Sequence, residues 1–148
     1  MRPLLSAFVG AVVCAACGAG NAPVSVYLGA PQAGEYSYRA ERDGAPVVEG
    51  RMSLVIQGEA GVTGSWVLAR ATGSDTTVVV GPQLGSGEVE GTVTDGTVSL
   101  NLNPGWADNN VFLAIRSAGP GVWTGSWEHS TIAGPVAGGA VSLQRVVR

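Results

Sequence analysis

The chain has 148 residues, enough for one domain and a short appendage. Charged residues make up only 13 %, lysine is absent and the net charge is -3, so the basic surface that nucleic-acid binding requires is missing. Hydrophobic residues make up 45 %, which argues against disorder despite 23 glycines. We therefore expect one small all-β domain with many turns.

Residues 1–16 have the composition of a signal peptide. A short positive start precedes an uncharged run that ends at Ala16 and is too short to span a bilayer. The run leads into Cys14-Ala-Ala-Cys17-Gly18, which resembles a bacterial lipobox, where small residues precede a cysteine that is lipidated and becomes the first mature residue. Cys14 departs from the pattern, since leucine is usual there.

This resemblance implies an exported lipoprotein that is anchored to a membrane through Cys17. We expect it in the cell envelope, on the periplasmic side or associated with the outer membrane. The alternative is an ordinary signal peptide cut after a small residue, which would give a free secreted protein. Residues 17–33 are rich in Gly, Ala and Pro and are predicted to be a flexible linker before one domain over residues 34–148.

After the linker the chain reads as strands, because apolar and polar residues alternate with a period of two. Asp43-Gly44 and Asp95-Gly96 are strong turn signals between such segments. No window shows helical periodicity. We predict eight or nine strands, over residues 35–42, 47–57, 62–71, 76–80, 88–94, 97–103, 111–116, 122–130 and 140–147.

A single sheet this wide would expose its whole apolar face, so it must close on itself. Gly50, Gly64, Gly91 and Gly125 all fall on the predicted apolar face, where they suit the strong coiling of a barrel. We therefore predict an antiparallel up-and-down β-barrel of about eight strands, in preference to an immunoglobulin-like sandwich. An outer-membrane barrel would place the apolar face outward, but several strands are too short for that span.

The chain also contains a weak internal repeat. Residues 54–57, a turn, and Val-Thr-Gly-Ser-Trp66 are similar to residues 113–116, a turn, and Trp-Thr-Gly-Ser-Trp127. Two similar halves would give a pseudo-symmetric barrel, whereas similar hairpin chemistry alone would also produce the match.

The Gly64-Ser-Trp66 strand in a Gly-rich up-and-down barrel resembles the calycin group, which includes lipocalins and avidins. The resemblance covers general architecture from Glu35 onward and implies a lipocalin-like fold. Lipocalins place this tripeptide in the first strand, whereas here it falls in the third strand and again in a strand near the end. No ligand residue is carried over from that group.

Aromatic residues are the main binding candidates. At a barrel mouth they would line a pocket for a small hydrophobic ligand; the alternative is that they fill the interior. The predicted ligand set is Trp66, Trp123, Trp127, Tyr36 and Tyr38. Trp106, Asp108 and Asn109 lie in the longest polar loop and are predicted to contact a partner protein.

Nothing in the sequence indicates catalysis, a cofactor or a metal site. His129 is the only histidine, and the adjacent Glu128 points to the opposite face of its strand. Residues 108–110 lack the spaced acidic ligands of a calcium loop. Glu88 and Glu90 share a solvent-facing strand side, with Arg39 or Arg51 as expected cross-strand partners.

We expect a non-enzymatic exported lipoprotein whose barrel binds a small hydrophobic ligand or an envelope partner. The alternative is a tethered or secreted inhibitor or interaction module with a solid-packed barrel. A packed interior together with an exposed Trp106 loop would favour the alternative.

Overall fold

The computed structural model describes residues 30–147. The predicted signal peptide, Cys17 and residues 18–29 lie outside this range. Within it the chain forms eight β-strands: β1 (Gly34–Arg42), β2 (Ala45–Gln57), β3 (Gly61–Arg70), β4 (Gly85–Thr94), β5 (Thr97–Asn101), β6 (Asn110–Gly119), β7 (Val122–Thr131) and β8 (Gly134–Arg145).

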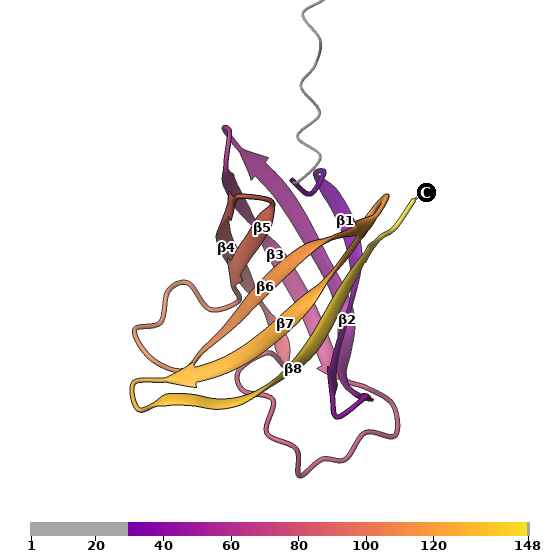
Figure 1. The fold of residues 1–148 in the computed structure, drawn as a ribbon. Coiled ribbons are helices and arrows are strands. Elements are labelled where there is room, and N and C mark those ends of the chain that lie inside the picture. The colour runs from indigo at the N-terminus through magenta and orange to yellow at the C-terminus, as the bar shows by residue number, and fades with distance from the viewer. Residues whose placement is uncertain (1–29, 148) are drawn as a thin grey trace, which may run out of the picture.

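The eight strands close into one antiparallel barrel in which sequence neighbours are also spatial neighbours (Figure 1). β1 pairs with β8 from Tyr36↔Arg145 to Glu41↔Ala140, which joins the two ends of the sheet. The apolar face of every strand is thereby enclosed, as the period-two pattern requires. The predicted up-and-down barrel of about eight strands is confirmed.

The predicted strand at residues 76–80 is wrong, because this segment belongs to the loop of residues 71–84. Its valines are used for burial without forming a strand: Val80 is buried, and Val78 packs against the core. The Arg70 guanidinium donates to the Val78 carbonyl at 2.8 Å and to the Asp75 carbonyl at 3.2 Å, which holds the loop in a curve.

The middle of the barrel is filled by side chains. Five of the largest are at most 2 % exposed: Trp127, Tyr36, Tyr38, Met52 and Leu54. A void large enough for water would expose the side chains that line it, so these values indicate close packing. Barrels of eight strands are narrow enough to be filled in this way.

Two of the interior glycines are required by the approach of a neighbouring strand. The Ser53 carbonyl oxygen occupies the space that a Cβ at Gly64 would need, and the Ala114 carbonyl oxygen does the same at Gly125. Gly64 pairs with Leu54 and Gly125 with Ile115. The coiling predicted from these glycines is therefore present at both copies of the repeated motif.

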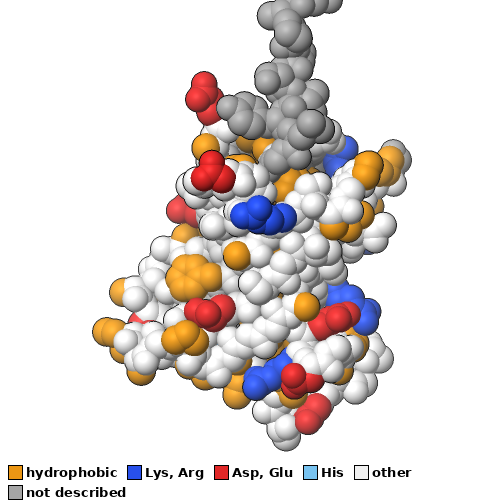
Figure 2. Space-filling model, in the orientation of Figure 1, with side chains coloured by type: hydrophobic (Ala, Val, Ile, Leu, Met, Phe, Trp, Pro, Cys, Tyr) orange, Lys and Arg blue, Asp and Glu red, His pale blue; other side chains and the backbone are white. Residues whose placement is uncertain are grey.

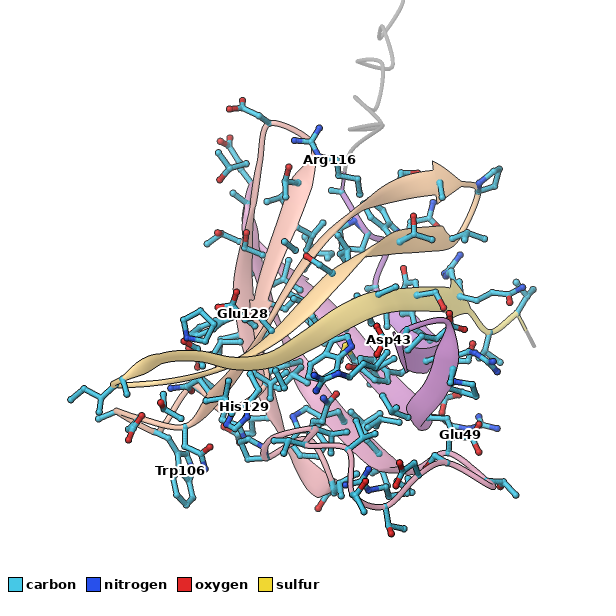
Figure 3. The ribbon with its side chains drawn as sticks, turned by 60° about the horizontal axis from the view of Figure 1, so that its bottom comes forward. Asp43, Glu49, Trp106, Arg116, Glu128 and His129 are labelled. Carbon is cyan, nitrogen blue, oxygen red and sulfur yellow. The ribbon has the colours of Figure 1, made fainter. Side chains whose placement is uncertain are left out.

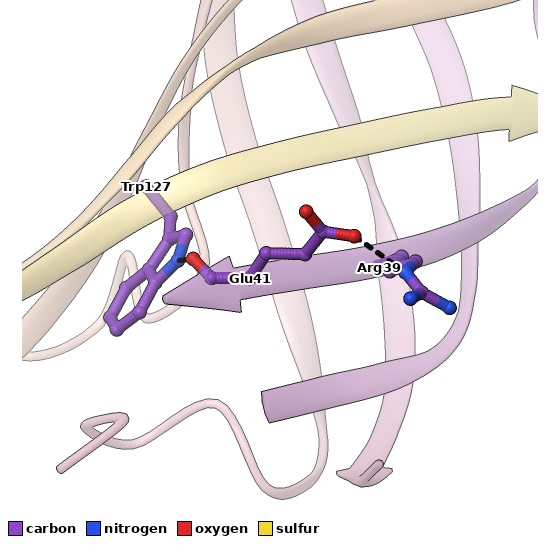
Figure 4. A network of polar contacts seen from close by, with 3 residues as sticks. All are labelled: Arg39, Glu41 and Trp127. Atoms are coloured by element: carbon purple, nitrogen blue, oxygen red, sulfur yellow. Dashed lines mark hydrogen bonds and ion pairs between the residues drawn. The ribbon is translucent and has the colours of Figure 1, made fainter. Parts of the chain in front are cut away.

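The tryptophan of each copy of the repeated motif forms hydrogen bonds to the backbone of another part of the barrel. The Trp66 indole N–H donates to the carbonyl oxygens of Leu102 at 2.8 Å and Glu88 at 3.0 Å. The Trp127 indole N–H donates to the Glu41 carbonyl at 3.1 Å (Figure 4). Both indoles are buried, so each N–H needs a partner of this kind.

A glycine on the next strand makes room for each indole. A Cβ at Gly87 on β4 would lie 2.5 Å from Cζ2 of Trp66. A Cβ at Gly139 on β8 would meet the Glu41 carbonyl oxygen first and would also lie 2.9 Å from Nε1 of Trp127. Trp66 reaches from β3 past β4, and Trp127 reaches from β7 past β8. The two arrangements are four strands apart, as expected for a pseudo-symmetric barrel of two halves, β1–β4 and β5–β8.

The barrel has two different rims. The loop rim carries residues 71–84, residues 102–109 and the turns at residues 43–44 and 132–133. The terminus rim carries the three other turns and both ends of the described chain. The rims lie at opposite ends in Figure 1.

Candidate functional site

A buried hydrogen-bond chain closes the loop rim. The Tyr38 hydroxyl donates to Oε1 of Gln83 at 2.6 Å, and Nε2 of Gln83 donates to the Val80 carbonyl at 2.6 Å. Gln83 is fully buried. Burial raises the pKa of Tyr38, because the ionised phenol would have to sit in the barrel interior. The loop of residues 71–84 therefore seals this end of the barrel.

Side-chain hydrogen bonds hold the loop of residues 102–109 against the strands. Nε2 of His129 lies 2.6 Å from Oδ1 of Asn109, and Nδ2 of Asn110 donates to the Trp106 carbonyl at 3.1 Å. Oδ1 of Asp108 accepts from the backbone N–H of Asn109 at 2.7 Å and from that of Ile132 at 2.6 Å. The loop is thus tied to β7, to its own end and to the β7–β8 turn.

Trp106 itself projects away from the barrel (Figure 3) and is 67 % exposed. The hydrogen bond from Asn110 to the Trp106 carbonyl fixes the backbone at this position, and the indole is presented to solvent from it. Other large apolar side chains are exposed at or near this rim: Leu84, Phe112, Ile132 and Val136. Figure 2 shows hydrophobic side chains gathered at the lower left, where β7 and β8 meet in Figure 1.

His129 has a structural position. It is 7 % exposed, and Gly81, with φ of 70°, packs so closely that a Cβ there would lie 2.5 Å from its ring. Glu128 points outward, as predicted, and is exposed. No group of three potential metal ligands occurs among residues 30–147. The contact of Nε2 with Asn109 holds the loop against β7, while the buried Nδ1 has no hydrogen-bond partner among residues 30–147.

An open depression of about 690 Å³ lies at the terminus rim. Its lining is mixed: the exposed Pro120 and Val147 and the buried Tyr36 and Trp123 are apolar or aromatic, whereas Gln32, Ser117, Gln144 and Arg145 are polar. Nη1 of Arg145 donates to Oε1 of Gln32 at 2.6 Å, and the Tyr36 hydroxyl donates to the Gln32 carbonyl at 2.7 Å. Burial raises the pKa of Tyr36, and the nearby Arg145 charge and the hydrogen bond to Gln32 oppose part of that rise.

The structure separates the predicted ligand residues. Tyr36 and Trp123 line the depression at the terminus rim. Trp127 and Tyr38 are inside the packed barrel, while Trp66 forms part of a different depression toward the loop rim. The five residues therefore do not converge on one cavity.

The three residues that are predicted to contact a partner lie together at the loop rim. Trp106, Asp108 and Asn109 are all exposed, and they lie in the loop that His129 and Ile132 hold. Gln83 could not be found from the sequence, because an isolated glutamine in a Gly/Pro-rich loop carries no burial signal. Arg145 could not be found either, because its contacts with Gln32 and Ala33 form only when β8 closes against β1.

The expected partners of Glu88 and Glu90 are wrong. Arg39 pairs with Glu41 on β1 at 2.8 Å (Figure 4), and Arg51 pairs with Glu35 at 3.4 Å. β4 lies between β3 and β5, out of reach of those arginines. Within the described part of the chain, Glu88 and Glu90 have no ion pair.

Comparisons with known proteins add no assignment, since no family model, no curated protein and no solved structure matches this chain. Among residues 30–147 there is no helix that is long and apolar enough to cross a membrane.

Proposed function

We propose that this protein is a non-enzymatic, exported interaction module that is tethered to a membrane of the cell envelope through Cys17. Its barrel serves as a solid support for the loop rim, which contacts a partner protein. The anchor is carried by the lipobox-like sequence, and the contact surface is centred on Trp106.

The exposed Trp106 is the observation that carries the proposal. Large aromatic side chains are enriched at protein interfaces, because they bury much area at a small cost in side-chain entropy. Here the indole is 67 % exposed, although three hydrogen bonds from neighbouring residues fix the loop that bears it. A preformed loop reduces the entropy that is lost on binding.

The orientation of the barrel supports the same function. The described chain begins at the terminus rim, so a tether there leaves the loop rim on the side away from the anchor (Figure 1). The packed interior favours a protein partner over a ligand enclosed in the barrel.

The test is site-specific photo-crosslinking in cells that naturally make the protein. A photoreactive amino acid replaces Ala107, which is exposed beside Trp106, in one variant and Asp95, which lies in a turn at the terminus rim, in the control. We expect a discrete crosslinked adduct from position 107 and none from position 95. Adducts from both positions, or from neither, would contradict the proposal.

A second candidate function is binding of an amphiphilic molecule at the terminus rim. The open depression there combines the exposed apolar side chains of Pro120 and Val147 with the Arg145 guanidinium. An apolar chain with an anionic head group matches that combination.

A further inference from the structure

We propose that the opening between β4 and the segment of residues 102–106, which we name the β4 seam, binds a short, extended and basic segment of the partner protein. The segment pairs with the free edge of β4 near Ser86 as an added β-strand. This inference rests on the proposed function, since it defines the chemistry of the partner at the loop rim.

The β4 seam exists because β5 is short. β5 has five residues, whereas β4 and β6 have ten each. Pairing between β4 and β5 ends at Glu90↔Asn101, and the chain then turns toward β6, where the Leu102 N–H donates to the Val111 carbonyl at 2.9 Å. Residues 85–89 of β4 therefore have a strand neighbour on the β3 side alone.

The backbone groups of Ser86 and Glu88 point into this opening. In an antiparallel ladder, alternate residues direct their N–H and C=O to the same neighbour. The Val93 N–H donates to the Ala60 carbonyl at 2.8 Å, on the β3 side, so Thr92 and Glu90 face β5, and Glu88 and Ser86 face the same side beyond its end. Within residues 30–147 neither N–H has a hydrogen-bond partner. Such a free edge is a template for an added strand.

The two hydrogen bonds of the Trp66 indole set the inner limit of the site. Because its indole N–H binds both the Glu88 and Leu102 carbonyls, β4 and the facing segment stay close at that level. On the loop-rim side lies a depression of about 420 Å³, at one wall of which Nδ2 of Asn103 donates to the Pro82 carbonyl at 3.1 Å. Ser86 lies on its β4 side, and the exposed Leu84 and Trp106 both line it. A short segment that enters from the rim can pair with Ser86 and place an apolar side chain against Leu84 and Trp106.

The charges around the seam select a basic segment. Glu88 lines the depression, and Glu90 and Glu128 line two shallow depressions beside it. Among residues 30–147, no arginine lines any of the three. All three carboxylates are exposed and without an ion pair in the described chain, so a cationic segment would meet complementary charge.

The test uses the purified protein and a synthetic heptapeptide of alternating arginine and valine, with both ends blocked. Isothermal titration calorimetry measures its affinity for wild type, for Ser86→Pro and for Ser86→Ala. Proline removes the outward N–H at an edge position that can accept it, whereas alanine keeps the backbone group. We expect Ser86→Pro to weaken binding at least tenfold and Ser86→Ala to change it less than twofold.

Modified peptides give a test that needs no variant. N-methylation of every second amide, first of the valines and then of the arginines, blocks one backbone edge at a time. One of the two methylated peptides should lose at least tenfold in affinity, and a peptide with glutamate in place of arginine should bind at least tenfold more weakly. These comparisons hold even if Ser86→Pro lowers the stability of the barrel.

The inference is overturned if both methylated peptides bind as tightly as the parent, if a folded Ser86→Pro variant binds normally, or if the basic peptide does not bind at millimolar concentration. It is also overturned if wild type forms dimers that Ser86→Pro disperses, because the occupant is then a second copy. A crosslink from a photoreactive amino acid at position 107 that persists in Ser86→Pro would uphold the proposed function while this inference fails.

Discussion

Single side chains that end in a polar group determine how the barrel closes. Trp66 and Trp127 place an apolar ring inside the barrel and direct one N–H to backbone oxygens of another strand. Tyr38 does the same with its hydroxyl, which reaches Gln83 of the loop that seals the rim. At each position the ring supplies burial and the polar atom defines a single arrangement.

Tyr38 should make the stability of the protein depend on alkaline pH. Burial raises its pKa in the folded chain above the ordinary value of about 10. Such a group stabilises the fold fully below the unfolded pKa, and this contribution falls as the pH rises toward the folded pKa. We expect the urea midpoint to change little from pH 7 to 9 and to drop above about pH 10.

Tyr38→Phe is the matched variant for this measurement. It should be less stable at pH 8 by about 1–3 kcal/mol, because Oε1 of Gln83 loses its donor in a buried site. Its midpoint should then fall less steeply above pH 10 than that of wild type, with the buried Tyr36 contributing the remaining slope. Equal alkaline slopes for the two proteins would show that the Tyr38 phenol ionises without cost in the fold.

At the scale of strands, close backbone approach explains the glycines that interrupt the apolar face. β7 passes so near β6 at Gly125 that the Ala114 carbonyl occupies the place of a side chain. Glycine within a strand lowers the stability of the strand, and barrel closure, which the close approach of β6 and β7 permits, offsets this loss. Coiling of this kind gives the barrel its narrow and filled interior.

Gly125→Ala should destabilise the barrel strongly. The added methyl group meets a backbone oxygen, which cannot move without shifting a strand, and we expect a loss of about 2 kcal/mol or more. Gly105→Ala is the control, because a Cβ there has nothing within 4 Å and should change stability by less than about 0.5 kcal/mol. Urea unfolding monitored by circular dichroism measures both. Equal effects would exclude close strand approach as the reason for Gly125.

Most of the strands could be predicted from alternation, because burial on one face leaves a local signal with a period of two. The loop of residues 71–84 could not, since Val78 and Val80 have the composition of a strand but are used to seal a rim. The expected partners of Glu88 and Glu90 conflict with the predicted topology itself. In an up-and-down barrel sequence neighbours are spatial neighbours, so Arg39 on β1 and Arg51 on β2 lie out of reach of β4.

At the scale of the molecule, three tryptophans belong to the core and one belongs to the surface. Trp66, Trp123 and Trp127 are at most 5 % exposed, whereas Trp106 is 67 % exposed. The mouth at the terminus rim is the place where a core tryptophan, Trp123, comes near an open depression. Fluorescence can therefore separate a packed barrel from a ligand-binding one.

Trp106→Phe should shift the tryptophan emission to shorter wavelength and remove most of the quenching by acrylamide, because the exposed indole is lost. Trp123→Phe is the matched control and should leave the quenchable component in place. Titration of the Trp106→Phe variant with laurate then tests the second candidate function, and a saturable change would place an amphiphile at the terminus rim. Strong quenching that survives in Trp106→Phe would mean that the interior admits small molecules.

The hydrogen bonds of the two tryptophans also bear on how such a barrel can arise. Trp66 of the first half binds the segment that follows β5 in the second half, and Trp127 of the second half binds β1 in the first. Each half thus donates an indole hydrogen bond to the backbone of the other half. Two equivalent contacts of this kind are what an isologous, two-fold homodimer interface has. A four-stranded ancestor would have needed a single such contact surface to pair with its own copy. Duplication of its gene would then have joined the two copies through a turn as short as that at residues 95–96.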